Sequence, residues 1–266
     1  LFVSIRILEL SSKMRIAVKA PDLCTKSLCS SYNCAMSVPP RPAHRRTELL
    51  LVLVPMLWGL GYPLIRSSMD TVGPLGFLFL RFGSGLLPLA VIFRRSFARI
   101  DSRALREGVI TGIALFFAYA FLNWGLVYTT TAKAGFIIGL RVILVPITGA
   151  LLFRLRAAPL SWIASFVSLC GLAFIFFGEF DPPLSLNPGD VLMVASAFFF
   201  ALHVLLVSRY VVRENYIPLL LLQITTVVLI SGAGSLVFES GPIPGRNEVW
   251  GSALLAGVFS TALAFW

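Results

Sequence analysis

Long apolar runs separated by short polar connections constrain this chain more than any other feature of its sequence. Eight runs follow one another: 49–65, 72–93, 108–128, 132–153, 157–178, 190–208, 216–238 and 250–266. About 20 apolar residues cross the hydrocarbon core of a bilayer as a helix. The runs lack strand-like alternation, and a backbone inside lipid must satisfy its own hydrogen bonds. The sequence therefore predicts an all-α polytopic membrane protein.

Composition and charge agree with this fold class. The chain is 58% hydrophobic and 13% charged, whereas a soluble domain carries about a quarter charged residues. Its formal net charge of +10 would suggest a nucleic-acid partner if the protein were soluble. Outside the connections there is no basic stripe interleaved with aromatic residues, so we expect no nucleic-acid partner.

The connections alternate between basic and acidic. The arginine-rich connections are 94–107, 154–160 and 209–215. The connections that carry acids are 66–71, 179–189 and 239–249. Because Lys and Arg are concentrated in cytoplasmic loops, the basic set should face the cytoplasm. We expect an integral protein of a bacterial plasma (inner) membrane, in contact with lipid and with its N-terminus in the cytoplasm.

Residues 1–47 differ from the rest of the chain, since they carry eight Lys or Arg residues and two acids. Such a basic, acid-poor segment is compatible with a targeting peptide. We favour a simpler interpretation, in which Met36 begins a basic leader and residues 1–35 are upstream sequence read in frame, without a fold. Residues 1–47 are expected to be disordered, and their cysteine spacing fits no zinc pattern.

An internal repeat runs through the apolar part at a fixed offset of 142 residues. The offset places Trp58 on Phe200 and Arg81 on Gln223. The repeat unit begins again after five helices. Because five is an odd number of spans, the second copy has the opposite orientation in the membrane. Inverted repeats around a site near the midplane are typical of secondary transporters. We expect one repeat at 49–178 and a second at 190–266.

Several short motifs follow one another along the apolar part of the chain. They are Leu57-Trp-Gly-Leu60, Leu78-Phe-Leu-Arg-Phe82, Tyr128-Thr-Thr-Thr-Ala-Lys-Ala-Gly135, Val145-Pro146, Leu160-Ser-Trp162, Gly171 and Thr261-Ala-Leu-Ala-Phe265. In this order they resemble the EamA family of the drug/metabolite transporter superfamily. The resemblance implies ten helices in two inverted five-helix repeats, and movement of small metabolites, often export of amino acids or related compounds. One connection departs from the family pattern, because 153–156 lacks the Glu that many members carry there.

The repeat and the resemblance together predict that the second repeat is truncated after three helices. A second copy of 49–178 would end near residue 320, that is 178 + 142, whereas the sequence ends at Trp266. We therefore expect eight transmembrane helices of ten.

Polar side chains inside the spans are the candidate functional residues, because each is costly in lipid unless it has a partner. Arg81 and Arg141 lie near the middle of their spans. One interpretation is a cationic site for a carboxylate, which a guanidinium binds with two hydrogen bonds. The alternative is structural, with Arg81 holding the carbonyls of a helix end or a broken helix. Lys133 either attracts substrate and gates the site or extends to the interface.

Other side chains complete the candidate substrate site: Trp58, Asn123, His203 and Gln223. Of the spanning residues, His203 alone titrates near neutral pH at its ordinary pKa, although a lone histidine is more often hydrogen-bonded packing. Pro63 and Pro146 are expected to kink gating helices. No metal or cofactor is expected.

No Asp or Glu lies well inside a predicted span. This favours facilitated diffusion or exchange, or proton coupling through His203 alone. A membrane-embedded enzyme would need a nucleophile, an acid–base pair or a metal set, which the spans do not offer. A receptor or scaffold would leave the repeat unexplained. The sequence predicts a secondary transporter or exporter of amino-acid-like, organic-anion or drug-like solutes, working by alternating access.

Overall fold

The structure, a computed structural model, describes most of the apolar part of the chain. Described are residues 72–154, 159–176, 187–211 and 216–239, with Ile65, Arg66, Ser68, Gly251, Ala253, Leu254 and Gly257. All of them belong to the second of two compact units, Leu57–Trp266. The helices are α3 (Pro74–Ile92), α4 (Ser102–Tyr128), α5 (Thr131–Gly139), α6 (Arg141–Phe153), α7 (Pro159–Phe176), α8 (Pro188–Tyr210) and α9 (Tyr216–Phe238), with a 3-10 helix, η1 (Arg94–Arg99). These residues contain no strand, so the all-α prediction is confirmed for them.

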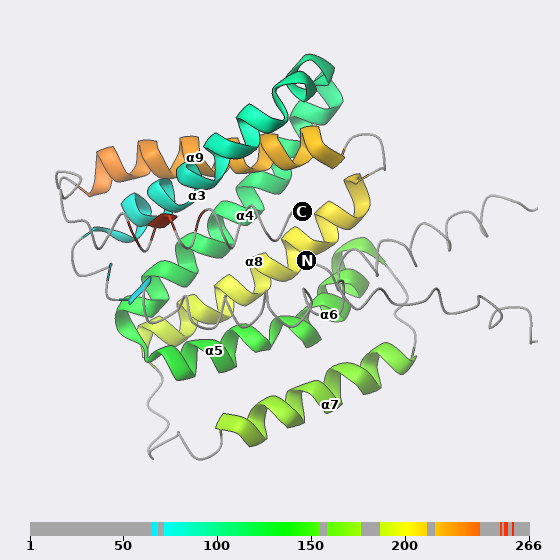
Figure 1. Cartoon of the computed structure of the whole chain (residues 1–266). Helices are drawn as coiled ribbons and strands as arrows, with labels where there is room; N and C mark the ends of the chain where they lie inside the picture. Colours follow the sequence, from blue (N-terminus) through cyan, green and yellow to red (C-terminus); the bar gives the residue numbers. More distant parts are fainter. Residues whose placement is uncertain are drawn as a thin grey trace, which may run out of the picture. The chain divides into compact units, whose positions relative to one another are not determined.

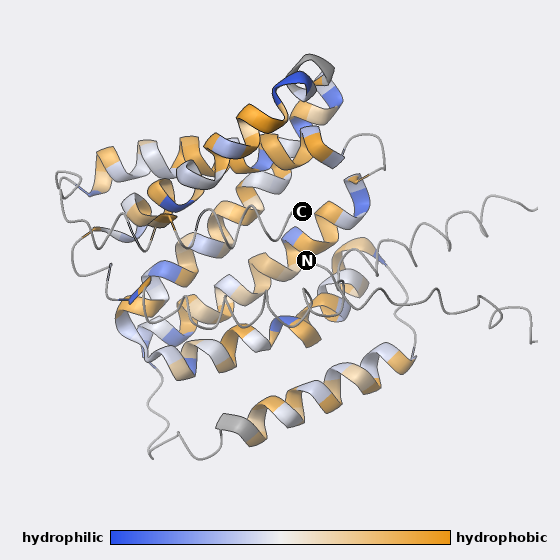
Figure 2. Ribbon diagram, viewed as in Figure 1, coloured by the Kyte–Doolittle hydropathy of each residue, from blue (hydrophilic) through white to orange (hydrophobic). Residues whose placement is uncertain are grey.

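Five helical stretches are long and apolar enough to cross a membrane: α3, α4, α8, α9 and Thr131–Phe153, which joins α5 and α6. Their apolar character extends to exposed faces, since Phe174 of α7 and Leu236 of α9 are 85% and 86% exposed. Figure 2 shows apolar residues along the helices and hydrophilic ones around η1 and at the end of α8. Helices that are apolar on all sides suit lipid. The chain is therefore an integral membrane protein.

The predicted spans agree with the described helices to within a few residues, with one exception. Helix α9 has the predicted bounds, and α3, α7 and α8 differ from prediction by one or two residues at each end. The exception is α4, which begins at Ser102 instead of residue 108, because the Asp101 carboxylate accepts a hydrogen bond from the Ala104 amide at 2.7 Å and caps the helix there.

Several predictions fall outside the described residues. These are the segment 1–47, most of the runs 49–65 and 250–266, and the residues Trp58 and Pro63. From the last run, Gly251, Ala253 and Leu254 are helical.

Helix α4 lies at the centre of the described bundle (Figure 1). It packs against α8 on one side and against α9 and α3 on the other, while α5 and α6 lie along α8 and α7 packs on α5 and α6. The α4–α9 contact depends on glycine. A Cβ on Gly108 would lie 2.4 Å from the Leu222 Cβ, and one on Gly112 would lie 2.6 Å from the Thr226 Cβ. Small residues spaced four apart thus let these helices approach closely.

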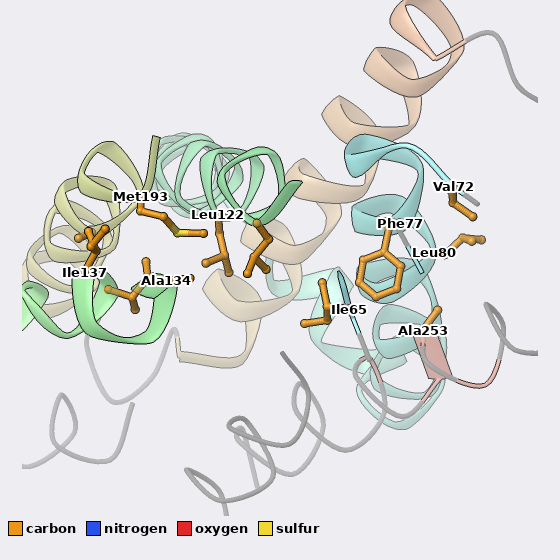
Figure 3. Packing of buried hydrophobic residues seen from close by; sticks show 12 residues of the cluster. Ile65, Val72, Phe77, Leu80, Leu122, Ala134, Ile137, Met193 and Ala253 are labelled. Carbon is orange, nitrogen blue, oxygen red and sulfur yellow. The ribbon is translucent and has the colours of Figure 1, made fainter. Parts of the chain in front are cut away.

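Two apolar clusters hold the bundle together. One joins α3, α4, α5 and α8, and Figure 3 shows its members, with Met193, Leu122 and Ala134 close together and Phe77 beside Ile65. The other joins α3, α4 and α9 around Leu78, Leu221 and Ile224. Tyr119 and Phe200 pack against both clusters, which places these two aromatic side chains at the middle of the bundle.

Candidate functional site

Two intramembrane arginines are connected by aromatic rings. The Arg81 Cζ lies 4.9 Å from the centre of the Tyr119 ring. The Tyr119 and Phe200 ring centres are 5.0 Å apart in an edge-to-face arrangement. The Arg141 Cζ lies 5.9 Å from the centre of the Phe200 ring. We call these four residues the arginine–aromatic row; they come from α3, α4, α8 and α6.

The row combines two stabilising interactions. A guanidinium over an aromatic face is stabilised by about 0.5–2 kcal/mol, with the larger value in desolvated surroundings. Edge-to-face ring pairs add about 0.5–1.5 kcal/mol each. Arg81 is 6% exposed and also lies 5.8 Å from the Phe82 ring, whereas Arg141 is only partly buried. Positive charge therefore lies at both ends of an aromatic wall inside the bundle.

A tightened turn positions Arg141. The amide of Leu140 donates to the Ile137 carbonyl and the amide of Ile143 donates to the Leu140 carbonyl, so the α5–α6 segment changes to three-residue spacing there. Arg141 is the first residue after this turn and lies near the middle of the Thr131–Phe153 span.

Helix α7 braces this turn from one side. Leu172 fills the space that a Cβ on Gly139 would need, since that atom would lie 2.1 Å from the Leu172 Cδ2. Pro146 has no amide hydrogen and cannot bond the Val142 carbonyl four residues earlier. The Ser165 hydroxyl of α7 donates to that carbonyl at 3.3 Å. Pro146 thus lies within α6 and contributes to the α6–α7 contact.

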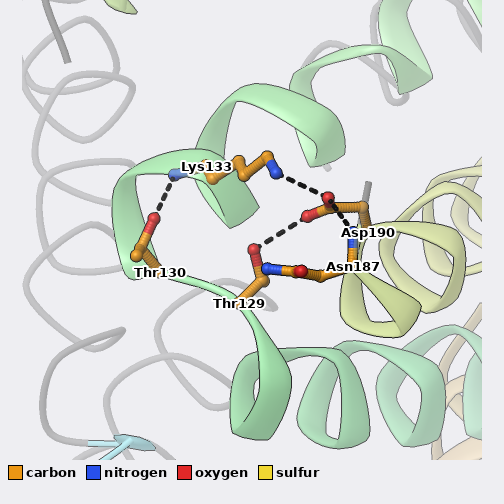
Figure 4. Close-up of polar contacts among 5 residues, drawn as sticks. All are labelled: Thr129, Thr130, Lys133, Asn187 and Asp190. Carbon is orange, nitrogen blue, oxygen red and sulfur yellow. Dashed lines mark hydrogen bonds and ion pairs between the residues drawn. The ribbon is translucent and has the colours of Figure 1, made fainter. Parts of the chain in front are cut away.

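Lys133 belongs to a polar cluster at one end of α4, α5 and α8 (Figure 4). The Asp190 carboxylate accepts hydrogen bonds from the Lys133 ammonium at 2.6 Å, the Thr129 hydroxyl at 2.8 Å and the backbone amide of Asn187 at 2.9 Å. Asp190 is in the first turn of α8, where the helix dipole favours a negative charge. This polar cluster (Thr129, Lys133, Asn187 and Asp190) ties the start of α5 to the start of α8.

Arg66 lies beside the polar cluster. Its Nη1 donates to the carbonyl oxygens of Leu126, at 2.6 Å, and Thr129. These carbonyls end α4, so Arg66 stabilises the negative end of that helix.

Asn123 and Glu239 both bind the start of α3. The Asn123 amide nitrogen donates to the Pro74 carbonyl at 3.0 Å. The Glu239 carboxylate, next to the end of α9, accepts hydrogen bonds from the amides of Leu75 and Gly76 at 2.8 and 2.7 Å. A Cβ on Gly73 would lie 2.2 Å from the Glu239 Cδ, so any larger residue here would have to displace this carboxylate.

His203 and Gln223 form a separate buried pair between α8 and α9. The His203 Nε2 and the Gln223 Oε1 are 3.0 Å apart, and the two residues are 6% and 4% exposed. The predicted site residues therefore fall in four places: Arg81 and Arg141 share the row, Lys133 is in the polar cluster, Asn123 binds α3, and His203 pairs with Gln223.

Three residues were not identified from the sequence. Phe200 connects the row to Arg141, and its equivalence to Trp58 in the repeat was the available signal. Asp190 pairs with Lys133, although the two residues lie in different predicted spans. Glu107 was assigned to the connection 94–107, yet it is 2% exposed on α4 and accepts a hydrogen bond from Arg103 Nε at 2.8 Å. Arg103 lies four residues earlier on the longer α4, where an i,i+4 pair places its guanidinium beside the Glu107 carboxylate.

Among the described residues, no group of three or more His, Cys, Asp or Glu side chains lies close enough together to hold a metal ion.

Comparisons with known proteins agree with this architecture. An uncharacterized transporter of Archaeoglobus fulgidus is 30% identical over 217 residues, which cover 82% of this chain and 66% of the relative. A second uncharacterized transporter of the same organism is 28% identical over 181 residues, 65% of this chain and 61% of the relative. This chain thus spans slightly less than two thirds of the length of both relatives.

A crystal structure of a protein matches with a TM-score of 0.61 and 21% identity, over 84% of this chain and 77% of that one, which supports the fold. The family model described as the EamA-like transporter family matches residues 45–177, half of the chain and the region that contains α3 to α7. This chain belongs to the EamA-like transporter family.

Proposed function

We propose that this chain is a secondary transporter of the drug/metabolite type, which moves small metabolites across the membrane by alternating access. The observation that carries the proposal is the arginine–aromatic row, because four helices bring two cations and two rings together inside the bundle. Polar side chains at this depth are expensive in lipid and typically mark the path of a substrate. Membership of a family of transporters supports the same conclusion.

The solute classes that fit are amino-acid-like, organic-anion and drug-like compounds. Arg81 and Arg141 supply positive charge, and Tyr119 and Phe200 supply flat apolar surface. Trp58, the repeat equivalent of Phe200, is proposed as a further wall residue. The buried amides and imidazole are proposed to contact polar groups of the solute in another state of the cycle: Asn123, Gln223 and His203.

The polar cluster is proposed as a gate. The Lys133–Asp190 ion pair joins a helix of the first proposed repeat to a helix of the second. Rocking of one repeat against the other would separate this pair and open the end of α4, α5 and α8. Pro146, and Pro63 outside the described residues, are proposed as the kinks that allow this motion.

The proposed inverted repeats, 49–178 and 190–266, receive support from the start points of two helices. Helix α3 begins at Pro74 and α9 at Tyr216, which is position 74 + 142. We place the N-terminus in the cytoplasm of a bacterial cell, with η1 on the same side. Cysteines introduced at Ser102 and Ser185 should be labelled from opposite sides of intact cells, Ser185 from outside. Labelling of both from one side contradicts this orientation.

Solute flux into liposomes tests the proposal directly. The purified protein should move at least one solute from a panel of amino acids, organic acids and drugs. Arg81→Gln should reduce that flux by about tenfold or more, since a charged hydrogen-bonding group is lost, and Arg81→Lys should restore part of it. Arg209→Gln is the matched control, because Arg209 also lies over a ring, Phe153 at 5.6 Å, but is exposed at the end of α8.

Each alternative class predicts a different result. A membrane-embedded enzyme would convert a solute without moving it, and a receptor or scaffold would bind without flux. Absence of flux across the whole panel, for correctly folded protein, contradicts the transport proposal.

A further inference from the structure

Arg141 is in a different situation from Arg81, although both lie near the middle of a span. Arg81 is 6% exposed and its guanidinium contacts two rings, whereas Arg141 is only partly buried and contacts the single ring of Phe200. With the residues that the structure describes, the Arg141 side chain forms no ion pair and no hydrogen bond. A cation at this depth is costly, and a negative partner lowers that cost.

Arg141 also lies at the start of a helix. Arg141 begins α6, directly after the tightened turn at Leu140. The first amide groups of a helix carry partial positive charge. Acid side chains do not compensate it among the described residues of α6, since the Arg141–Phe153 sequence contains no Asp or Glu.

The chemistry of the guanidinium then defines the ligand. Its Cζ lies over the Phe200 ring, and the edge of a guanidinium carries the N–H groups that bind a carboxylate with two parallel hydrogen bonds. Phe200 continues into Tyr119, so an apolar aromatic surface extends from the cation. A compound that matches both features has a carboxylate next to an aromatic or unsaturated group.

We infer that Arg141 binds the carboxylate of such an organic anion, while its apolar part contacts Phe200 and Tyr119. The inference rests on the proposed transport function and narrows its solute classes to organic anions. Amines are disfavoured, because a cationic group would be repelled by the Arg141 guanidinium. Neutral amides of the same shape lack the charge that Arg141 requires.

Three compounds that differ in one group test this inference: cinnamate, cinnamamide and cinnamylamine. Calorimetric titration of the purified full chain should give cinnamate an affinity at least about tenfold higher than cinnamamide, and cinnamylamine the lowest affinity. In Arg141→Gln the preference for cinnamate over cinnamamide should fall to about onefold. Arg141→Lys should retain part of it, because charge remains but the bidentate geometry is lost.

Controls separate binding from folding. Arg209→Gln should keep the preference of the wild-type protein, and Phe200→Leu should weaken cinnamate and cinnamamide alike, because it removes the ring and leaves the charge. Size-exclusion chromatography checks each variant. If Arg141→Gln does not fold, Arg141→Lys and Phe200→Leu still give the comparison.

The outcomes for this inference and for transport are distinct. A preference for cinnamate that survives in Arg141→Gln, or no measurable cinnamate binding to the wild-type protein, overturns the inference. Flux of another solute class without any preference for anions also overturns it and leaves transport standing. Cinnamate binding that depends on Arg141, without flux of any solute, supports the inference and overturns the transport proposal.

Discussion

The polar cluster and the arginine–aromatic row place positive charge in the same bundle but neutralise it differently. In the polar cluster the Lys133 ammonium faces the Asp190 carboxylate at 2.6 Å, and two more donors complete that carboxylate. In the row the guanidiniums of Arg81 and Arg141 face aromatic rings. A ring face offers a much weaker negative potential than a carboxylate.

This difference separates closure from binding. The polar cluster is electrically complete, so its contribution is to hold α5 and α8 together until the ion pair breaks. Arg141 keeps positive charge beside an aromatic surface suited to an apolar group, so a bound anion would neutralise it. We therefore expect mutations in the polar cluster to lower stability, and mutations in the row to lower solute affinity and flux.

Asp190→Asn should give the largest loss of stability. The substitution leaves the Lys133 ammonium without the carboxylate that it faces, and breaking a buried ion pair costs about 3 kcal/mol. Unfolding in detergent, followed by circular dichroism against denaturant concentration, measures the loss. The control is Asp101→Asn, at an exposed helix cap, where Asn caps as well as Asp and stability should change little. Equal losses in both variants would show that the ion pair does not hold the cluster together.

Gly112→Ala should have the next largest effect, because α4 packs on α9 at this residue, carries Tyr119 of the row and is followed directly by Thr129 of the polar cluster. The new Cβ would meet the Thr226 Cβ at 2.6 Å and the Gln223 carbonyl oxygen at 2.9 Å, and such overpacking costs about 1–3 kcal/mol. The matched control is Gly83→Ala on α3, where no atom lies within 4 Å, so alanine should stabilise the helix by about 0.5–1 kcal/mol. The same unfolding experiment compares the two, and stabilisation by Gly112→Ala would contradict close packing there.

The glycine pair also illustrates what the sequence could predict. Span positions follow from apolar length alone, because lipid imposes that length, and α9 accordingly has its predicted bounds. Gly108 and Gly112 face a neighbouring helix at short distance, whereas a Cβ on Gly83 would have no atom within 4 Å. Which face of a helix meets a neighbour depends on packing across the bundle, which a single apolar run does not encode.

Charge pairing is harder to predict from sequence than span positions, because it also depends on packing across the bundle. Lys133 and Asp190 are 57 residues apart, and nothing local to either residue indicates the partner. Glu107 seemed to belong to a polar connection, yet helix α4 extends far enough to bury it beside Arg103. Arg81 and Arg141 were identified from depth in the span, but their connection through Tyr119 and Phe200 required the arrangement of four helices.

Ser165→Ala should have the smallest effect and tests the brace behind Arg141. The Ser165 hydroxyl donates to the Val142 carbonyl, which has no amide partner because Pro146 lacks an N–H. An interhelical hydrogen bond in a membrane contributes about 0.6–1 kcal/mol. In a Pro146→Ala background the new amide can bond the Val142 carbonyl within α6, so Ser165→Ala should then cost close to nothing.

Ser208→Ala is the control for Ser165→Ala, because the Ser208 hydroxyl bonds the Leu205 carbonyl on its own helix. Unfolding free energies of the four variants in this cycle give the coupling. Equal costs of Ser165→Ala in both backgrounds would mean that Pro146 does not create the need for the serine, and that the turn carrying Arg141 is held by Leu172 against Gly139 instead.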